Sequence, residues 1–70
     1  MVQVPKKPQR WVLGYAKDGF LVDYLKHPDF MFDSPEKAVD MRPDGYMLLR
    51  RMLPWLQITD IFVAPLDEFR

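Results

Sequence analysis

The stretch WVLGYAKDGFLVDYL, residues 11–25, decides the fold of this 70-residue chain. Two runs rich in aromatic and branched side chains flank the dipeptide Asp18-Gly19. Asp-Gly favours a two-residue type I′ turn, because both central residues of that turn need a positive φ. The stretch therefore predicts a β-hairpin. The cross-strand pairs that follow from this turn are Lys17–Phe20, Tyr15–Val22 and Leu13–Tyr24.

Both faces of the predicted hairpin are largely apolar. Because side chains alternate between the faces of a strand, one face carries Trp11, Leu13, Tyr15, Phe20, Val22 and Tyr24. The other face carries Val12, Gly14, Ala16, Leu21, Asp23 and Leu25. A solvated two-layer sheet normally has one clearly polar face. We therefore expect one face to meet something other than the domain's own helix, or to be covered by the arm or the tail of the chain.

The rest of the chain predicts two helices and a returning strand. Ser34 fits a helix N-cap and Pro35 the first helical position, and Arg42-Pro43 interrupts this helix after about two turns. A second helix is predicted from Pro43 to about Leu53, where Pro54 ends it. Residues 56–64 predict a strand that is interior to the sheet, because apolar residues fall on both of its faces. A third short strand near residue 30 is compatible with the pattern.

Together these elements predict an α+β domain, in which an antiparallel hairpin and a C-terminal strand form one sheet with one main helix packed on it, in the order ββ-α-α-β. Residues 1–10 are interpreted as a flexible basic arm, residues 11–65 as a single domain and residues 66–70 as an acidic tail. A domain of this size buries only about 60% of the surface that its unfolded chain exposes, so we expect marginal stability.

Composition argues against several classes of protein. Ten Lys and Arg residues balance ten Asp and Glu residues, whereas nucleic-acid-binding proteins usually carry a basic excess. The chain has no cysteine, so disulfides, thiol catalysis and Cys-ligated metal sites are excluded. Small secreted domains usually need disulfides, which favours a cytoplasmic location. No apolar run is longer than four residues, whereas a transmembrane helix needs about 20, so we expect no membrane association.

The residues that carry catalytic chemistry are few. His27 is the only histidine and Ser34 the only serine. His27 with nearby aspartates is either a base or metal ligand or a histidine of an exposed turn, and Ser34 is either a nucleophile or a helix cap. The acidic residues form either a hard-cation site or a solvated rim; they are Asp29, Asp33, Glu36 and Asp40. Because one imidazole makes a poor transition-metal site and capping explains Ser34, we predict no enzyme, no metal and no cofactor.

Two kinds of binding surface remain. The predicted partner-binding residues are Trp11, Tyr15, Phe20 and Tyr24, with Arg50 and Arg51 as a charged rim. Trp and Tyr are enriched at interaction hot spots, although the same aromatic face is equally well explained as the core. The alternative is a nucleic-acid surface, in which Lys6, Lys7 and Arg10 precede Trp11 and act together with the two arginines. A homodimer through the second apolar face of the hairpin is compatible with both.

Three segments within residues 11–64 form a recognisable pattern: Trp11-Val12-Leu13, then Lys17-Asp18-Gly19-Phe20-Leu21, then Phe32-Asp33-Ser34-Pro35-Glu36-Lys37-Ala38. This pattern resembles a loose class of small accessory proteins from phages and prophages. Its usual members have an Ala-rich Lys/Glu helix, whereas here Met41-Arg42-Pro43 interrupts the helix and Arg50-Arg51 replaces the mixed charge. The resemblance implies a protein that binds a host protein and inhibits or redirects it, as anti-defence proteins do, and it implies no catalytic residue.

Overall fold

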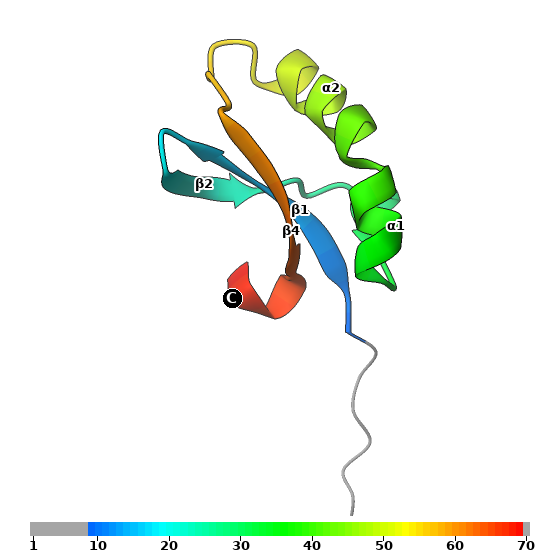
Figure 1. Cartoon of the computed structure of the whole chain (residues 1–70). Helices are drawn as coiled ribbons and strands as arrows, with labels where there is room; N and C mark the ends of the chain where they lie inside the picture. Colours follow the sequence, from blue (N-terminus) through cyan, green and yellow to red (C-terminus); the bar gives the residue numbers. More distant parts are fainter. Residues whose placement is uncertain (1–8, 70) are drawn as a thin grey trace, which may run out of the picture.

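The computed structural model describes residues 9–69, which form a four-stranded antiparallel sheet with two helices (Figure 1). The elements in chain order are β1 (Trp11–Lys17), β2 (Phe20–Tyr24), the 3-10 helix η1 (Pro28–Phe30), β3 (Met31–Phe32), α1 (Pro35–Asp40), α2 (Arg42–Met52), β4 (Asp60–Pro65) and the 3-10 helix η2 (Leu66–Phe69). The predicted α+β class is confirmed. The short strand expected near residue 30 is β3.

Strand β1 lies at the centre of the sheet. One of its edges pairs with β4 from Trp11 to Ala16, and the other pairs with β3 near its start and with β2 near its end. The C-terminal strand β4 therefore lies at the edge of the sheet, and the prediction that it is interior is wrong. It also begins later than predicted, because residues 56–59 belong to the loop between α2 and β4. Strand β4 carries apolar side chains on both faces because both faces of the sheet are covered, and not because a further strand pairs with it.

The hairpin has the predicted turn but not the predicted register. Asp18 and Gly19 have φ angles of 51° and 82°, as a type I′ turn requires, and Lys17 faces Phe20. Further along, the register shifts, so that Tyr15 faces Asp23 instead of Val22 and Gly14 faces Tyr24. This β-bulge adds one residue to β2 and reverses the faces of the residues that follow it. Tyr24 consequently lies on the face opposite Tyr15, and the predicted single aromatic face is wrong.

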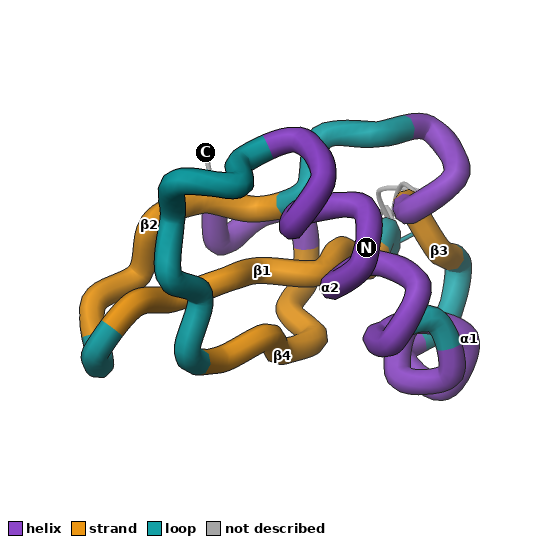
Figure 2. Tube along the Cα trace, turned by 90° about the horizontal axis from the view of Figure 1, so that it is seen from above, coloured by secondary structure: helices purple, strands orange, loops and turns teal. Residues whose placement is uncertain are grey.

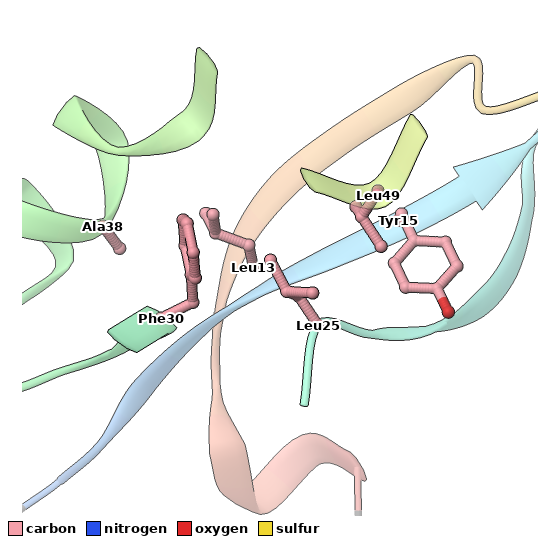
Figure 3. Close-up of a cluster of buried hydrophobic side chains, with 6 residues drawn as sticks. All are labelled: Leu13, Tyr15, Leu25, Phe30, Ala38 and Leu49. Atoms are coloured by element: carbon pink, nitrogen blue, oxygen red, sulfur yellow. The ribbon is translucent and has the colours of Figure 1, made fainter. Parts of the chain in front are cut away.

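The helices cover the face of β1 that carries Leu13 and Tyr15. These two residues form a buried cluster with residues from the loop after β2, from η1 and from both helices (Figure 3); the other members are Leu25, Phe30, Ala38 and Leu49. Gly45 lets helix α2 lie close to β1, since a Cβ atom at this position would lie 2.5 Å from Leu13 Cδ1. This layer is the main core of the domain.

The opposite face of the sheet is covered by η2 (Figure 1). The ring of Phe69 lies 4.9 Å from the ring of Tyr24, centroid to centroid. Gly14 makes room for this packing, since a Cβ atom there would lie 2.7 Å from the Phe62 ring and 3.0 Å from the Phe69 ring. The segment predicted as an acidic tail therefore supplies an apolar cover, and it occupies the hairpin face that we expected to need one.

Helix α1 begins as its sequence predicts, whereas α2 begins at Arg42, one residue before the predicted Pro43. The Ser34 hydroxyl accepts a hydrogen bond from the Lys37 backbone N–H at 3.4 Å and caps α1, and Pro35 occupies its first turn. Helix α1 ends at Asp40, and α2 follows after one residue, Met41. The break at Met41 comes one residue before the predicted Arg42-Pro43, and it separates two helices that remain packed on the same side of the sheet (Figure 2).

Candidate protein-interaction surface

The four aromatic residues predicted as partner contacts occupy different environments. Tyr15 is buried in the main core, and its substitution would therefore test folding more than binding. Trp11 is half-buried against the same core, and Tyr24 is half-buried under Phe69 on the other face. Only Phe20 is fully available to a partner, since 77% of it is exposed.

Five of the eight exposed large apolar residues of the described chain lie instead in β2 or in the segment from the end of α2 into the loop before β4. Leu21 and Val22, which follow Phe20 along β2, are 56% and 44% exposed. Leu21 faces Ala16 whereas Phe20 faces Lys17, so these two side chains lie on opposite faces of the hairpin. Trp55 in the loop between α2 and β4 is 75% exposed, and Met52 at the end of α2 is also exposed. We call these five residues the hairpin-end patch; they are Phe20, Leu21, Val22, Met52 and Trp55.

Hydrogen bonds hold the two parts of the hairpin-end patch at one end of the fold. The Asp18 backbone N–H donates to the Thr59 hydroxyl at 2.8 Å, and the Thr59 backbone N–H donates to the Ala16 carbonyl at 3.0 Å. These bonds join the hairpin turn to the last residues of the loop that carries Trp55. Figure 1 shows this loop at the top of the view and the turn of the hairpin at the left, both above η2.

The size of the hairpin-end patch suits a modest interface. Aromatic side chains bury about 150–250 Å² each when they are covered, so five apolar side chains of this exposure offer on the order of 500 Å². A standard protein–protein interface buries roughly 800 Å² on each partner. The patch can therefore supply the apolar centre of an interface for a partner that contacts both faces of the hairpin end, with polar surroundings as its rim.

The two arginines predicted as a charged rim lie on the exposed side of α2. Arg50 donates a hydrogen bond to the Tyr46 hydroxyl at 3.2 Å, and its guanidinium lies 5.8 Å from the centre of the Tyr46 ring. Arg51 is exposed. Of the basic arm, Arg10 is exposed, whereas Lys6 and Lys7 lie outside the described residues. Neither arginine belongs to the hairpin-end patch.

The residues considered for catalysis have local structural roles. His27 caps η1, because its Nδ1 accepts a hydrogen bond from the Asp29 backbone N–H at 3.1 Å. Asp33 lies 2.9 Å from Lys37 Nζ, and this hydrogen bond and positive charge lower the pKa of the Asp33 carboxyl. Within residues 9–69, no group of three His, Cys, Asp or Glu side chains is placed to hold a metal ion. The acidic residues 29, 33, 36 and 40 are all exposed.

A second surface feature lies where the helix junction meets β4. It is an open groove of about 530 Å³, and its lining comes from the end of α1, the start of α2 and the first half of β4; the residues are Val39, Asp40, Arg42, Pro43, Tyr46 and Ile61. Sequence reasoning did not find this groove, because its lining residues are brought together only by the packing of both helices against an edge strand. Trp55 was also missed, although a tryptophan directly after Pro54 was a usable signal for an exposed loop aromatic.

Comparisons of the chain with protein-family models, with curated proteins and with solved structures find no match. None of the helices within residues 9–69 has the length and apolar character needed to cross a membrane.

Proposed function

We propose that this chain is a small non-enzymatic protein-binding module that inhibits or regulates its partner, and that the hairpin-end patch is the centre of its binding surface. The observation that carries the proposal is the exposure of three consecutive large apolar residues of β2, together with the exposed Trp55 in the loop that Thr59 joins to the hairpin turn. Exposed apolar patches on small soluble domains commonly mark interaction sites. The resemblance to phage accessory proteins is our reason to propose a bacterial host protein as the partner.

Phe20 and Trp55 are the expected anchors of this interface. Large aromatic side chains that enter a partner's pocket dominate binding energies, while the residues around them mainly exclude water. The chain has no net charge, so long-range electrostatic attraction contributes little to such a complex. Binding centred on this patch should therefore change little between low and moderate salt concentrations.

The test is retention of proteins from nuclease-treated bacterial lysate on the immobilised full chain, at low and moderate salt. We expect one dominant protein to be retained at both salt concentrations and to be lost when Phe20→Asp and Trp55→Ser are combined. The matched control is Met47→Ser, which removes a similarly exposed apolar side chain from the middle of α2. Its retention of the partner should equal that of the wild type.

Two outcomes would contradict the proposal. If retention depends on nucleic acid or disappears at moderate salt, the chain is instead a nucleic-acid-binding protein that uses its basic arm and arginines. If Met47→Ser reduces retention as much as the paired substitution, the hairpin-end patch is not the binding surface. Circular dichroism of each variant separates loss of binding from loss of folding.

A further inference from the structure

Strand β4 has one edge that no other strand of residues 9–69 occupies. In an antiparallel pair, alternate residues direct both main-chain groups toward the partner strand. The Leu66 N–H donates to the Arg10 carbonyl at 2.8 Å, which fixes this alternation along the β1–β4 register. Phe62 and Ala64 therefore bond to β1, and the N–H and C=O groups of Ile61 and Val63 point outward from the sheet.

The free edge is short. Pro65, the next residue of β4 whose main-chain groups point outward, has no N–H to donate. Asp60 at the other end of the strand is charged and exposed. Short length, proline and charge are the usual means by which proteins limit pairing at sheet edges. What remains is the stretch from Ile61 to Val63, with two donors and two acceptors. A segment that binds there needs a further source of affinity and specificity.

The edge on the other side of the sheet is better protected. Strand β2 contains the β-bulge, and the Tyr24 N–H donates to the Asp23 carboxylate at 2.8 Å. Asp23 also lies 3.4 Å from Lys26 Nζ, which places two charges at the end of this strand. An incoming strand would meet an interrupted ladder and charged side chains at β2, but a regular ladder at Ile61 and Val63.

The groove at the helix junction lies directly beside the free edge of β4. Ile61 lines this groove, and because it faces Tyr15 across the sheet, its side chain lies on the face that the helices cover. A strand added to β4 would lie about 4.8 Å farther out, and its alternate side chains on that face would meet Val39, Pro43 and Tyr46. These lining residues are mainly apolar, so the added strand needs an apolar side chain there.

The charges at the groove further define its occupant. Arg42 lines the groove at the first turn of α2, and within residues 9–69 it makes neither an ion pair nor a hydrogen bond through its side chain. The positive end of the α2 dipole lies at the same place. An acidic side chain next to the apolar one would therefore be favoured, while Asp40 on the α1 side of the groove disfavours a purely acidic segment.

We propose that the outer edge of β4 and the adjoining groove bind an extended segment of a protein partner, which pairs with Ile61 and Val63 as an additional strand. The segment places an apolar side chain against Val39, Pro43 and Tyr46 and an acidic side chain at Arg42. This mode of recognition takes its affinity from main-chain hydrogen bonds and its specificity from alternate side chains. The proposal does not depend on the hairpin-end patch, because none of that patch's residues lines the groove.

The experiment selects binding peptides from a displayed library of random eight-residue sequences on the immobilised full chain. We expect the enriched peptides to alternate apolar residues and to carry an acidic residue beside one of them. In solution, an enriched peptide should slow the amide exchange of Ile61 and Val63, while Phe62 and Ala64 are protected without it. Val63→Pro should weaken the peptide at least tenfold, because it removes an outward donor but no bond to β1.

Val63→Ala is the matched control, since it shortens the same side chain but keeps the N–H, and it should bind within about threefold of the wild type. Arg42→Glu should favour enriched peptides in which lysine replaces the acidic residue, and it keeps the test informative if Val63→Pro fails to fold. Equal binding by Val63→Pro and Val63→Ala, or no enriched peptide, would overturn the proposal. Protection of Ile61 and Val63 that grows with protein concentration alone would overturn it in favour of a second copy of the chain.

Discussion

At the scale of single residues, Tyr15 combines burial with a titratable group. Burial raises the pKa of Tyr15 above its ordinary value of 10.0, and the nearby Asp23 carboxylate raises it further, while Lys26 acts in the opposite direction. Figure 3 shows its hydroxyl directed away from the rest of the core cluster. A raised pKa means that the folded state disfavours the ionised phenol more than the unfolded state does.

This difference predicts how stability depends on pH. The contribution of Tyr15 is complete below pH 10 and is lost as the pH rises from the unfolded pKa through the folded one. We expect the free energy of unfolding of Tyr15→Phe to fall less steeply above pH 10 than that of the wild type, as measured by urea denaturation at a series of pH values. Tyr46→Phe, which removes a phenol from an exposed residue, is the control. Parallel declines for Tyr15→Phe and the wild type would contradict the prediction.

At the scale of elements, α1 depends strongly on its cap. It has only six residues, and helices this short are unstable without capping and tertiary packing. Ser34→Ala removes the hydroxyl that accepts from the Lys37 N–H and should cost about 1 kcal/mol of stability. Thermal or urea denaturation measures the cost. Ser34→Asp, which also caps well, should remain within a few tenths of a kcal/mol of the wild type, and an equal loss in both variants would show that the cap is not the cause.

The elements also show which features a sequence can predict. The type I′ turn and the Ser34 cap were predicted because both depend on neighbouring residues and their intrinsic preferences. The bulge in β2 was not, because Val22 is as good a strand residue as Leu21 and nothing local marks it as the extra one. Since the faces of a strand depend on register, that single residue also misplaced Tyr24 relative to Tyr15. Phe20 was predicted as a contact and is exposed, but its companions on the aromatic face are not.

At the scale of the whole molecule, long-range contacts decide what local patterns leave open. The C-terminal strand was predicted as interior because its apolar residues suit both faces of a sheet. In the structure these apolar residues belong to an edge strand, because the helices cover one face of the sheet and η2 covers the other. Leu66 and Phe69, at helical spacing within a segment that otherwise reads as acidic, were the signal for this second cover. The groove beside Ile61 likewise exists only once the helices are packed on the sheet.

The second cover makes the C-terminus a structural part of this domain. Phe69 packs on Tyr24 and over Gly14. Replacing a fully buried phenylalanine with alanine typically costs about 3–5 kcal/mol of stability. Because Phe69 is only half-buried, Phe69→Ala should cost less, about 1–3 kcal/mol. The substitution also removes an apolar ring that lies with Phe62 over Gly14, and we expect reversible self-association at high concentration. Urea denaturation and sedimentation velocity measure the two effects. Glu68→Ala, which changes an exposed neighbour, should produce neither. If Phe69→Ala matched Glu68→Ala in both measurements, residues 66–69 would not stabilise the sheet, and the apolar face of the hairpin would need another partner in solution.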